Sequence, residues 1–208
     1  MKAIKLINKV DYSVAKKTNW VYNHSKKFLF PFFNVMTALL KNGFIYIVTG
    51  LTLLLFISTR KLGLLILLSI LVGLLFTNLI IKNIVRRTRP YKSGNEHFTS
   101  WWEEAGKMTD VGSSFPSGHT TSAAAVGMIL FLSFDMTFSW IFLIIPVVIG
   151  FSRIYYMVHY LSDVLGGLLV GLLSALLSIY ILNLCFDISW FLKVYNLPSI
   201  VDLIKHML

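Results

Sequence analysis

The chain has 208 residues, of which 56% are hydrophobic and 13% are charged, and its formal net charge of +10 gives an isoelectric point of about 9.7. The mean hydropathy of +0.74 is far from that of an ordinary soluble domain and predicts an integral membrane protein. The positive charge does not indicate nucleic-acid binding, because no recognition motif accompanies the basic residues.

Residues 1–42 are expected to form a basic segment at the membrane surface. Apolar residues recur at helical spacing from Ile4 to Val21, opposite several lysines, which is typical of an amphipathic helix among lipid headgroups. A solvated tail without a role would show the same pattern. The run FLFPFFNVMTALL (28–40) is too short to span a bilayer and contains Pro31, so it is expected to be interfacial or re-entrant.

Five apolar runs follow, each bounded by charges or turn residues. Glycine, serine and alanine recur inside them, as they do where membrane helices approach closely. We therefore predict an all-α fold, an integral membrane bundle with about five transmembrane helices over residues 43–184, followed by an amphipathic C-terminal tail at 185–208. The runs cover residues 43–58, 62–81, 118–134, 138–158 and 159–183.

The second run ends in the basic sequence KNIVRRTRP. Lys82 and Arg89 are seven residues apart, so they would share one face of a continuing helix. Pro90 disfavours helical geometry at Arg89 and leaves the guanidinium free to bind an oxyanion in a fork. Taken alone, this stretch more simply predicts basic side chains that snorkel to lipid headgroups at a helix end.

The sequence SSFPSGHTTS (113–122) is a turn that opens directly into a helix. Unpaired backbone amides and the helix dipole make such a helix start an anion site, and Gly118 allows an anion to approach the backbone. Ser117 and His119 project from the first turn. A plain helix start with a serine cap is the alternative.

The sequence SRIYYMVHYLSD (152–163) places Arg153 at the end of one run, with His159 and Asp163 four residues apart at the start of the next. On one helix this spacing puts the carboxylate beside the imidazole. A carboxylate on one ring nitrogen raises the basicity of the other, as a nucleophilic or general-base histidine requires. The two side chains can also merely satisfy each other, although ionisable groups inside a membrane bundle are costly and favour a function.

Together the three stretches supply a helix N-terminus, two histidines and three fixed cations, Lys82, Arg89 and Arg153. Phosphoryl transfer needs such a set, because charge develops on the phosphorus oxygens while a nucleophile attacks and the leaving oxygen takes a proton. No histidine, cysteine or acidic cluster has metal-ligand spacing, so the cations are expected to replace magnesium and no cofactor is expected.

These stretches resemble, in order, the signatures K-x6-RP, PSGH and SR-x5-H-x3-D of the type 2 phosphatidic acid phosphatase superfamily. The resemblance implies that His159 attacks phosphorus to form a phosphohistidine, that Asp163 orients it, and that His119 protonates the leaving oxygen and later activates water. Arg86, Arg87 and His97 are not motif positions and are expected to contact headgroups at best. The resemblance assigns the phosphate oxygens to Lys82, Arg89, Ser117, Gly118 and Arg153.

The resemblance further implies a metal-independent enzyme whose site faces the extracytoplasmic side of a bacterial plasma membrane. The lysine-rich N-terminus would then lie outside, against the positive-inside rule. Five apolar spans favour the membrane branch over soluble acid phosphatases and vanadate haloperoxidases. The expected partners are a lipid phosphate and membrane lipids, with no nucleic acid and no obligate protein partner.

The substrate class stays open at this stage. Undecaprenyl pyrophosphate, phosphatidylglycerol phosphate and phosphatidic acid all fit the motifs, because a cationic cradle binds the phosphoryl group and not the tail. A phosphotransferase would use the same intermediate. A non-catalytic anionic-lipid transporter is a third reading, but it would not need both histidines and Asp163.

The segment YKSGNEHFTSWWEEAGKMTDVG (91–112) separates the first two motifs. Its aromatic side chains are of the kind that settle at the headgroup level. We expect this insert to cover the site and help select the headgroup. A membrane anchor without selectivity is the alternative.

Overall fold

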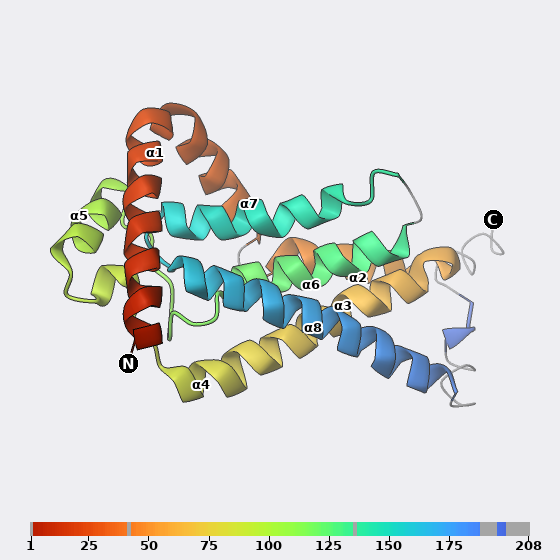
Figure 1. Cartoon of the computed structure of the whole chain (residues 1–208). Coiled ribbons are helices and arrows are strands. Elements are labelled where there is room, and N and C mark those ends of the chain that lie inside the picture. Colours follow the sequence, from red (N-terminus) through yellow and green to blue (C-terminus); the bar gives the residue numbers. More distant parts are fainter. Residues whose placement is uncertain (1, 41–42, 135–136, 188–194, 199–208) are drawn as a thin grey trace.

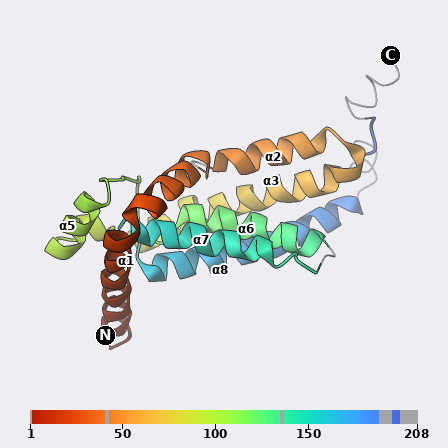
Figure 2. The same ribbon diagram turned by 90° about the horizontal axis from the view of Figure 1, so that it is seen from above.

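The computed structural model describes residues 2–40, 43–134, 137–187 and 195–198, so most of the expected C-terminal tail lies outside the described residues. The regular structure of these residues is helical throughout, which confirms the expected all-α class. Five helices run alongside one another as a bundle (Figure 1, Figure 2). They are α2 (Phe44–Leu54), α3 (Arg60–Leu74), α6 (Gly118–Ser133), α7 (Ile141–Tyr155) and α8 (Leu161–Phe186).

The helix that carries the first motif is longer than the predicted run at 62–81. It continues from α3 through a π-helical segment, η3 (Leu75–Ile81), into α4 (Lys82–Val85). The wider π turns shift the direction in which Lys82 leaves the helix, and such segments are frequent at functional sites. The helix ends before Arg86, whose φ of 48° is left-handed. Short elements complete this part of the chain, namely η2 (Ile57–Thr59), η4 (Pro90–Lys92) and α5 (Glu96–Glu104).

In the N-terminal segment, α1 (Lys2–Leu40) is a single helix with Pro31 inside it. The expected interfacial or re-entrant run at 28–40 is therefore the second part of this helix. Figure 1 shows that α1 bends: its first part crosses the end of the bundle, and its second part turns back to meet α2. A proline inside a helix removes one backbone hydrogen bond and is a common cause of a kink.

The face of α1 that packs on the protein is not the predicted apolar stripe. Asp11, Ala15 and Thr18 are buried, whereas Ile4 and Ile7 are exposed. The helix contacts α2, α7 and α8. The exposed apolar stripe is free for lipid, and an interfacial role for the first part of α1 stays a prediction.

By length and composition, fewer helices of the described residues could cross a membrane than the five predicted. Two stretches are long and apolar enough to cross a bilayer, Ile57–Lys92 and Leu161–Phe186, and α1 with α2, bent by 50°, would form a third. The apolar helices α6 and α7 have only 16 and 15 residues. At 1.5 Å per residue these reach about 24 and 22 Å, less than the roughly 30 Å of hydrocarbon. The outer face of α8 exposes a row of leucines to lipid, as an integral membrane protein requires.

The central helix of the bundle is α6, which packs against α3, α7 and α8. Glycines on α8 allow the closest of these contacts. A Cβ atom at Gly171 would lie 2.4 Å from the carbonyl oxygen of Thr121, and one at Gly167 would lie 2.7 Å from that of Ser117. Only glycine therefore fits, and the start of α8 is held directly against the start of α6.

Candidate active site

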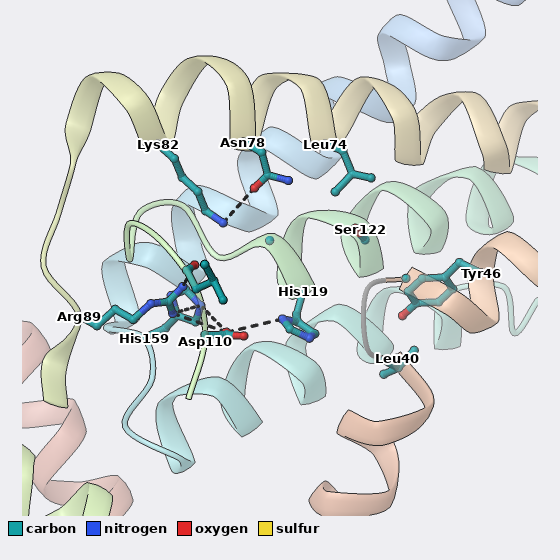
Figure 3. A pocket seen from close by; sticks show the side chains of 13 residues that line it. Leu40, Tyr46, Leu74, Asn78, Lys82, Arg89, Asp110, His119, Ser122 and His159 are labelled. Atoms are coloured by element: carbon teal, nitrogen blue, oxygen red, sulfur yellow. Dashed lines mark hydrogen bonds and ion pairs between the residues drawn. The ribbon is translucent and has the colours of Figure 1, made fainter. Parts of the chain in front are cut away.

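A pocket of about 210 Å³ is lined by residues from the start of α6 and from the turn before α8. The first part of α1 crosses this end of the bundle (Figure 1). Residues from all three motifs meet in the pocket, although they come from different elements (Figure 3). Lys82 begins α4, Arg89 follows that helix, Gly118 and His119 begin α6, and His159 lies in the turn between α7 and α8. The pocket thus collects two cations, two histidines and a helix N-terminus.

His159 and Asp163 lie side by side, but not for the predicted reason. They do not share a helix, because α8 begins at Leu161 and His159 precedes it. The Asp163 carboxylate instead reaches back to the helix start, where Oδ2 accepts a hydrogen bond from the backbone nitrogen of Tyr160 at 2.8 Å. The same oxygen is 3.6 Å from Nδ1 of His159. The helix cap therefore places the carboxylate beside the imidazole.

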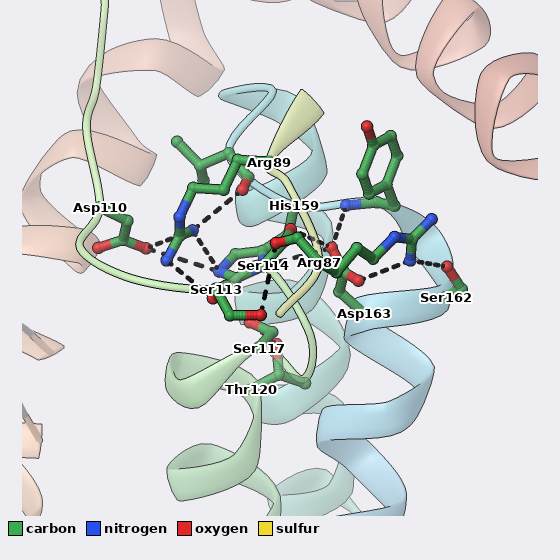
Figure 4. Close-up of polar contacts among 12 residues, drawn as sticks. Arg87, Arg89, Asp110, Ser113, Ser114, Ser117, Thr120, His159, Ser162 and Asp163 are labelled. Atoms are coloured by element: carbon green, nitrogen blue, oxygen red, sulfur yellow. Dashed lines mark hydrogen bonds and ion pairs between the residues drawn. The ribbon is translucent and has the colours of Figure 1, made fainter. Parts of the chain in front are cut away.

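Ser114 joins this pair, and the sequence motifs did not single it out. Its hydroxyl donates to Oδ2 of Asp163 at 2.5 Å and lies 3.5 Å from Nδ1 of His159 (Figure 4). All three side chains are buried. Nδ1 of His159 is thus enclosed by polar groups, and Nε2 is the ring nitrogen that faces the pocket.

Arg87 corrects the expectation that it contacts headgroups. It donates to Oδ1 of Asp163 at 2.7 Å (Figure 4). It also donates to Oδ2 of Asp11 at 2.8 Å, and its guanidinium lies 4.0 Å from the ring centroid of Tyr160. Asp11 also accepts hydrogen bonds from the backbone and hydroxyl of Ser162. A guanidinium between two carboxylates forms charge-assisted hydrogen bonds with both and fixes their positions. Arg87 therefore ties α1 to the carboxylate beside His159.

Replacing Arg87 with methionine should lower kcat for phosphate release by roughly 10- to 100-fold, the usual effect of losing a group that orients a functional side chain. KM should change little, because Arg87 does not line the pocket around His159. The variant also removes the cationic partner of Asp11, so part of the loss can come from stability. Adding Asp11→Asn should restore the unfolding temperature without restoring kcat. Recovery of kcat in the double variant would mean that Arg87 acts on stability alone.

Arg89 is buried and aimed into the pocket by backbone carbonyls. Its guanidinium donates to the carbonyl oxygens of Val111 at 2.8 Å and of Gly112 and Val158 at 3.1 Å. Nη1 also lies 3.2 Å from Nε2 of His159. When Arg89 donates to Nε2, the ring proton is on Nδ1, facing Asp163, and the lone pair of Nε2 is directed at the Arg89 guanidinium.

Lys82 faces the start of α6 from the other side of the pocket. Its ammonium donates to Oδ1 of Asn78 at 2.9 Å. A Cβ atom built on Gly118 would lie 3.8 Å from this ammonium, so the missing side chain leaves a gap between the lysine and the helix N-terminus. Backbone amides and cations thus converge on one small space, which is suited to an oxyanion.

Arg153 and Ser117 do not line this pocket. Arg153 is buried in the last turn of α7, where Nη2 donates to the hydroxyl of Thr37 at 2.5 Å, and it shares a narrow crevice with His119. Ser117 is buried, and its hydroxyl oxygen accepts a hydrogen bond from Thr120 at 2.9 Å. A direct contact of either side chain with phosphate stays a prediction.

The opposite end of the pocket is apolar. Figure 3 shows this end on the far side of His119 from Arg89, where α1, α2 and α3 meet. It is lined by Leu40, Tyr46 and Leu74.

The insert reaches the pocket through a loop and not through its aromatic helix. In α5, Trp102 stacks on Tyr91 with 4.8 Å between ring centroids, and its neighbours pack on Tyr12 of α1. The loop after α5 instead contributes Asp110 and Val111 to the pocket. The expected cover over the site is therefore this loop.

Comparison with known proteins gave one family and two solved structures. The model of the PAP2 superfamily matches residues 62–187. LpxE from Aquifex aeolicus has a TM-score of 0.63 and 21% identity, over 79% of this chain and 93% of that chain. The first transmembrane PAP2 type phosphatidylglycerolphosphate phosphatase from Bacillus subtilis has a TM-score of 0.64 and 25% identity, over 85% of this chain and 86% of that chain. No curated protein was found to match this chain.

Proposed function

The chain belongs to the PAP2 superfamily, and on that premise we propose that it is a membrane lipid phosphatase that hydrolyses a lipid phosphate or diphosphate. The observation that carries this proposal is the pocket, in which Nε2 of His159 faces Arg89 and shares the space with Lys82 and His119. One end of the pocket is cationic and the other is apolar, as a lipid with a phosphorylated headgroup would require.

In the proposed reaction, Nε2 of His159 attacks phosphorus in line with the leaving oxygen and forms a phosphohistidine. Asp163 stabilises the imidazolium, and Lys82 and Arg89 neutralise the charge that develops on the equatorial oxygens. His119 donates a proton to the leaving oxygen. It then accepts a proton from the water that attacks the phosphohistidine and releases phosphate.

The remaining motif residues would complete the phosphate site. Gly118 lines the pocket in the first turn of α6, and its backbone amide would bind a phosphate oxygen. Ser117 and Arg153 would also bind phosphate oxygens, once their present hydrogen bonds within the protein are replaced by hydrogen bonds to the substrate. The proposed substrates are phosphatidylglycerol phosphate, undecaprenyl pyrophosphate and phosphatidic acid, and the similarity to the Bacillus subtilis phosphatase supports a glycerophospholipid.

The test is phosphate release by the purified protein from these three lipids in the presence of excess chelator. Release is expected to survive chelation, because the cations of the chain take the place of a metal. Within the described parts of the chain, no group of three or more histidine, cysteine or acidic side chains is placed to bind one. Oxygen-labelled water distinguishes hydrolysis from phosphotransfer, since only hydrolysis puts the label into phosphate. Folded protein that releases no phosphate from any of the three would contradict the proposal.

We also propose that the site faces the extracytoplasmic side of a bacterial plasma membrane. Arg60 and Lys61 lie near the start of α3, at the end of the bundle away from the pocket, and the positive-inside rule favours the cytoplasm there. Because Cys185 is the only cysteine, a Cys185→Ser background allows single thiols to be placed. A membrane-impermeant thiol reagent should label Lys92→Cys in intact cells and Lys61→Cys only after permeabilisation. The reverse pattern would place the site in the cytoplasm.

A further inference from the structure

The carboxylate of Asp110 lies inside the pocket, among the groups to which the proposed reaction assigns the phosphate. Oδ2 is 3.5 Å from Nη1 of Arg89, 3.6 Å from Nε2 of His159 and 3.9 Å from Nδ1 of His119 (Figure 3). The side chain is 24% exposed, so it is largely enclosed. Asp110 belongs to no motif and comes from the loop between α5 and α6.

This carboxylate is an anion that the site already holds. Burial by itself would raise the pKa of Asp110, but the contacts with His159, His119 and Arg89 outweigh it and hold that pKa well below its usual range. A carboxylate and a phosphate accept hydrogen bonds from the same cations. The three contacts are nevertheless longer than the roughly 2.7–2.9 Å of a strong charged hydrogen bond. Asp110 therefore occupies the site without binding it tightly.

The loop allows this side chain to leave while its backbone stays in place. Arg89 holds the carbonyl oxygens of Val111 and Gly112, and the hydroxyl of Tyr91 donates to the carbonyl oxygen of Asp110 at 3.3 Å. A rotation of the Asp110 side chain would thus empty the site without moving Arg89. The Asp110 carboxylate can therefore leave the site while the Arg89 guanidinium keeps its position.

We propose that Asp110 is a specificity-determining residue: its carboxylate occupies the phosphate site until a phosphoryl group with more negative charge displaces it. The inference rests on the proposed function, which makes this space the phosphate site. A phosphodiester headgroup carries one negative charge, as Asp110 does, so exchanging one for the other gains little. A phosphomonoester or a diphosphate carries more charge and gains more. Asp110 thereby excludes the abundant phosphodiester lipids of the membrane.

Asp110→Asn tests this role, because it keeps the size of the side chain and removes the charge. If the Asp110 carboxylate occupies the site about 90–99% of the time, the apparent affinity for phosphate is weaker by about 10- to 100-fold. The variant should therefore bind inorganic phosphate about 10- to 100-fold more tightly in titration calorimetry. Phosphatidylglycerol, a phosphodiester, should become a stronger competitive inhibitor of phosphate release in mixed micelles. Glu96→Gln, an exposed change of the same charge on α5, should alter neither value.

The outcomes separate the inference from the proposed function. Equal phosphate affinity in the wild type and the Asp110→Asn variant would overturn the inference and leave the phosphatase in place. Weaker phosphate binding in the variant would also overturn it, since Asp110 would then support the phosphate instead of competing with it. Phosphate binding by neither protein, together with no phosphate release, would overturn the phosphate site itself and the proposed function with it.

Discussion

The His159→Ala variant is expected to release no measurable phosphate from any lipid phosphate, a loss of roughly 10⁴-fold or more in kcat. The reason is geometric: Nε2 of His159 faces the pocket, while Nδ1 is enclosed by Ser114 and Asp163. Without this nitrogen no phosphohistidine forms, and the remaining cations only bind the substrate. The measurement is phosphate release, with substrate binding by the variant as evidence of an intact site.

His119→Ala should have a different signature, because this residue acts on protons. We expect a loss of about 10²- to 10⁴-fold with lipid substrates. The loss should shrink for a substrate whose leaving group needs no proton, and labelled phosphate should then accumulate on the protein. His97→Ala is the matched control, since His97 lies on α5 outside the pocket. If His119→Ala and His159→Ala lost the same activity with every leaving group, the separate proton-transfer role would be refuted.

A large effect is also expected for Asp163→Asn, with kcat lower by about 10³- to 10⁴-fold, as for other histidines that lose their orienting carboxylate. The amide no longer stabilises the imidazolium, and it also leaves the guanidinium of Arg87 with one carboxylate instead of two. Substrate KM should change much less than kcat. Steady-state kinetics on the folded variant provides the measurement.

A control for this variant lies at the other end of the same helix. Asp187 follows α8 and is exposed, so Asp187→Asn changes the charge equally without touching the site. It should retain wild-type kcat. A kcat for Asp163→Asn within tenfold of the wild type would show that the ring of His159 is oriented without the carboxylate, and the role proposed for Asp163 would be withdrawn.

Sequence spacing located the groups that now line the pocket because each stands at the end of an apolar run. Lys82, His119 and His159 are examples, and the bundle brings these ends together. Spacing was less reliable for local geometry. His159 and Asp163 are neighbours because Asp163 caps α8, and the predicted shared helix does not include His159.

The residues that the sequence did not reveal depend on contacts between distant segments. Asp110 reaches the site through the path of a loop, and Asp11 reaches Arg87 because α1 crosses the end of the bundle. The spacing of apolar residues predicts neither the path of this loop nor the position of α1. One signal was present: Asp11 is the first acidic residue in the chain, and the next, Glu96, comes 85 positions later. A solitary carboxylate in a lysine-rich helix suggests a specific partner, here Arg87.

The contact between Asp11 and Arg87 also bears on where the working unit of this protein begins. The family match starts at residue 62, and the residues with proposed chemical roles all lie after it. Yet one of the two carboxylates that hold Arg87 is that of Asp11 on α1, which lies 51 residues before that boundary. The region that defines the family is thus smaller than the region that aligns its reactive groups. Exchanging the N-terminal helices of two such proteins would leave the three motifs intact. It would also replace the α1 residue that holds Arg87 in place.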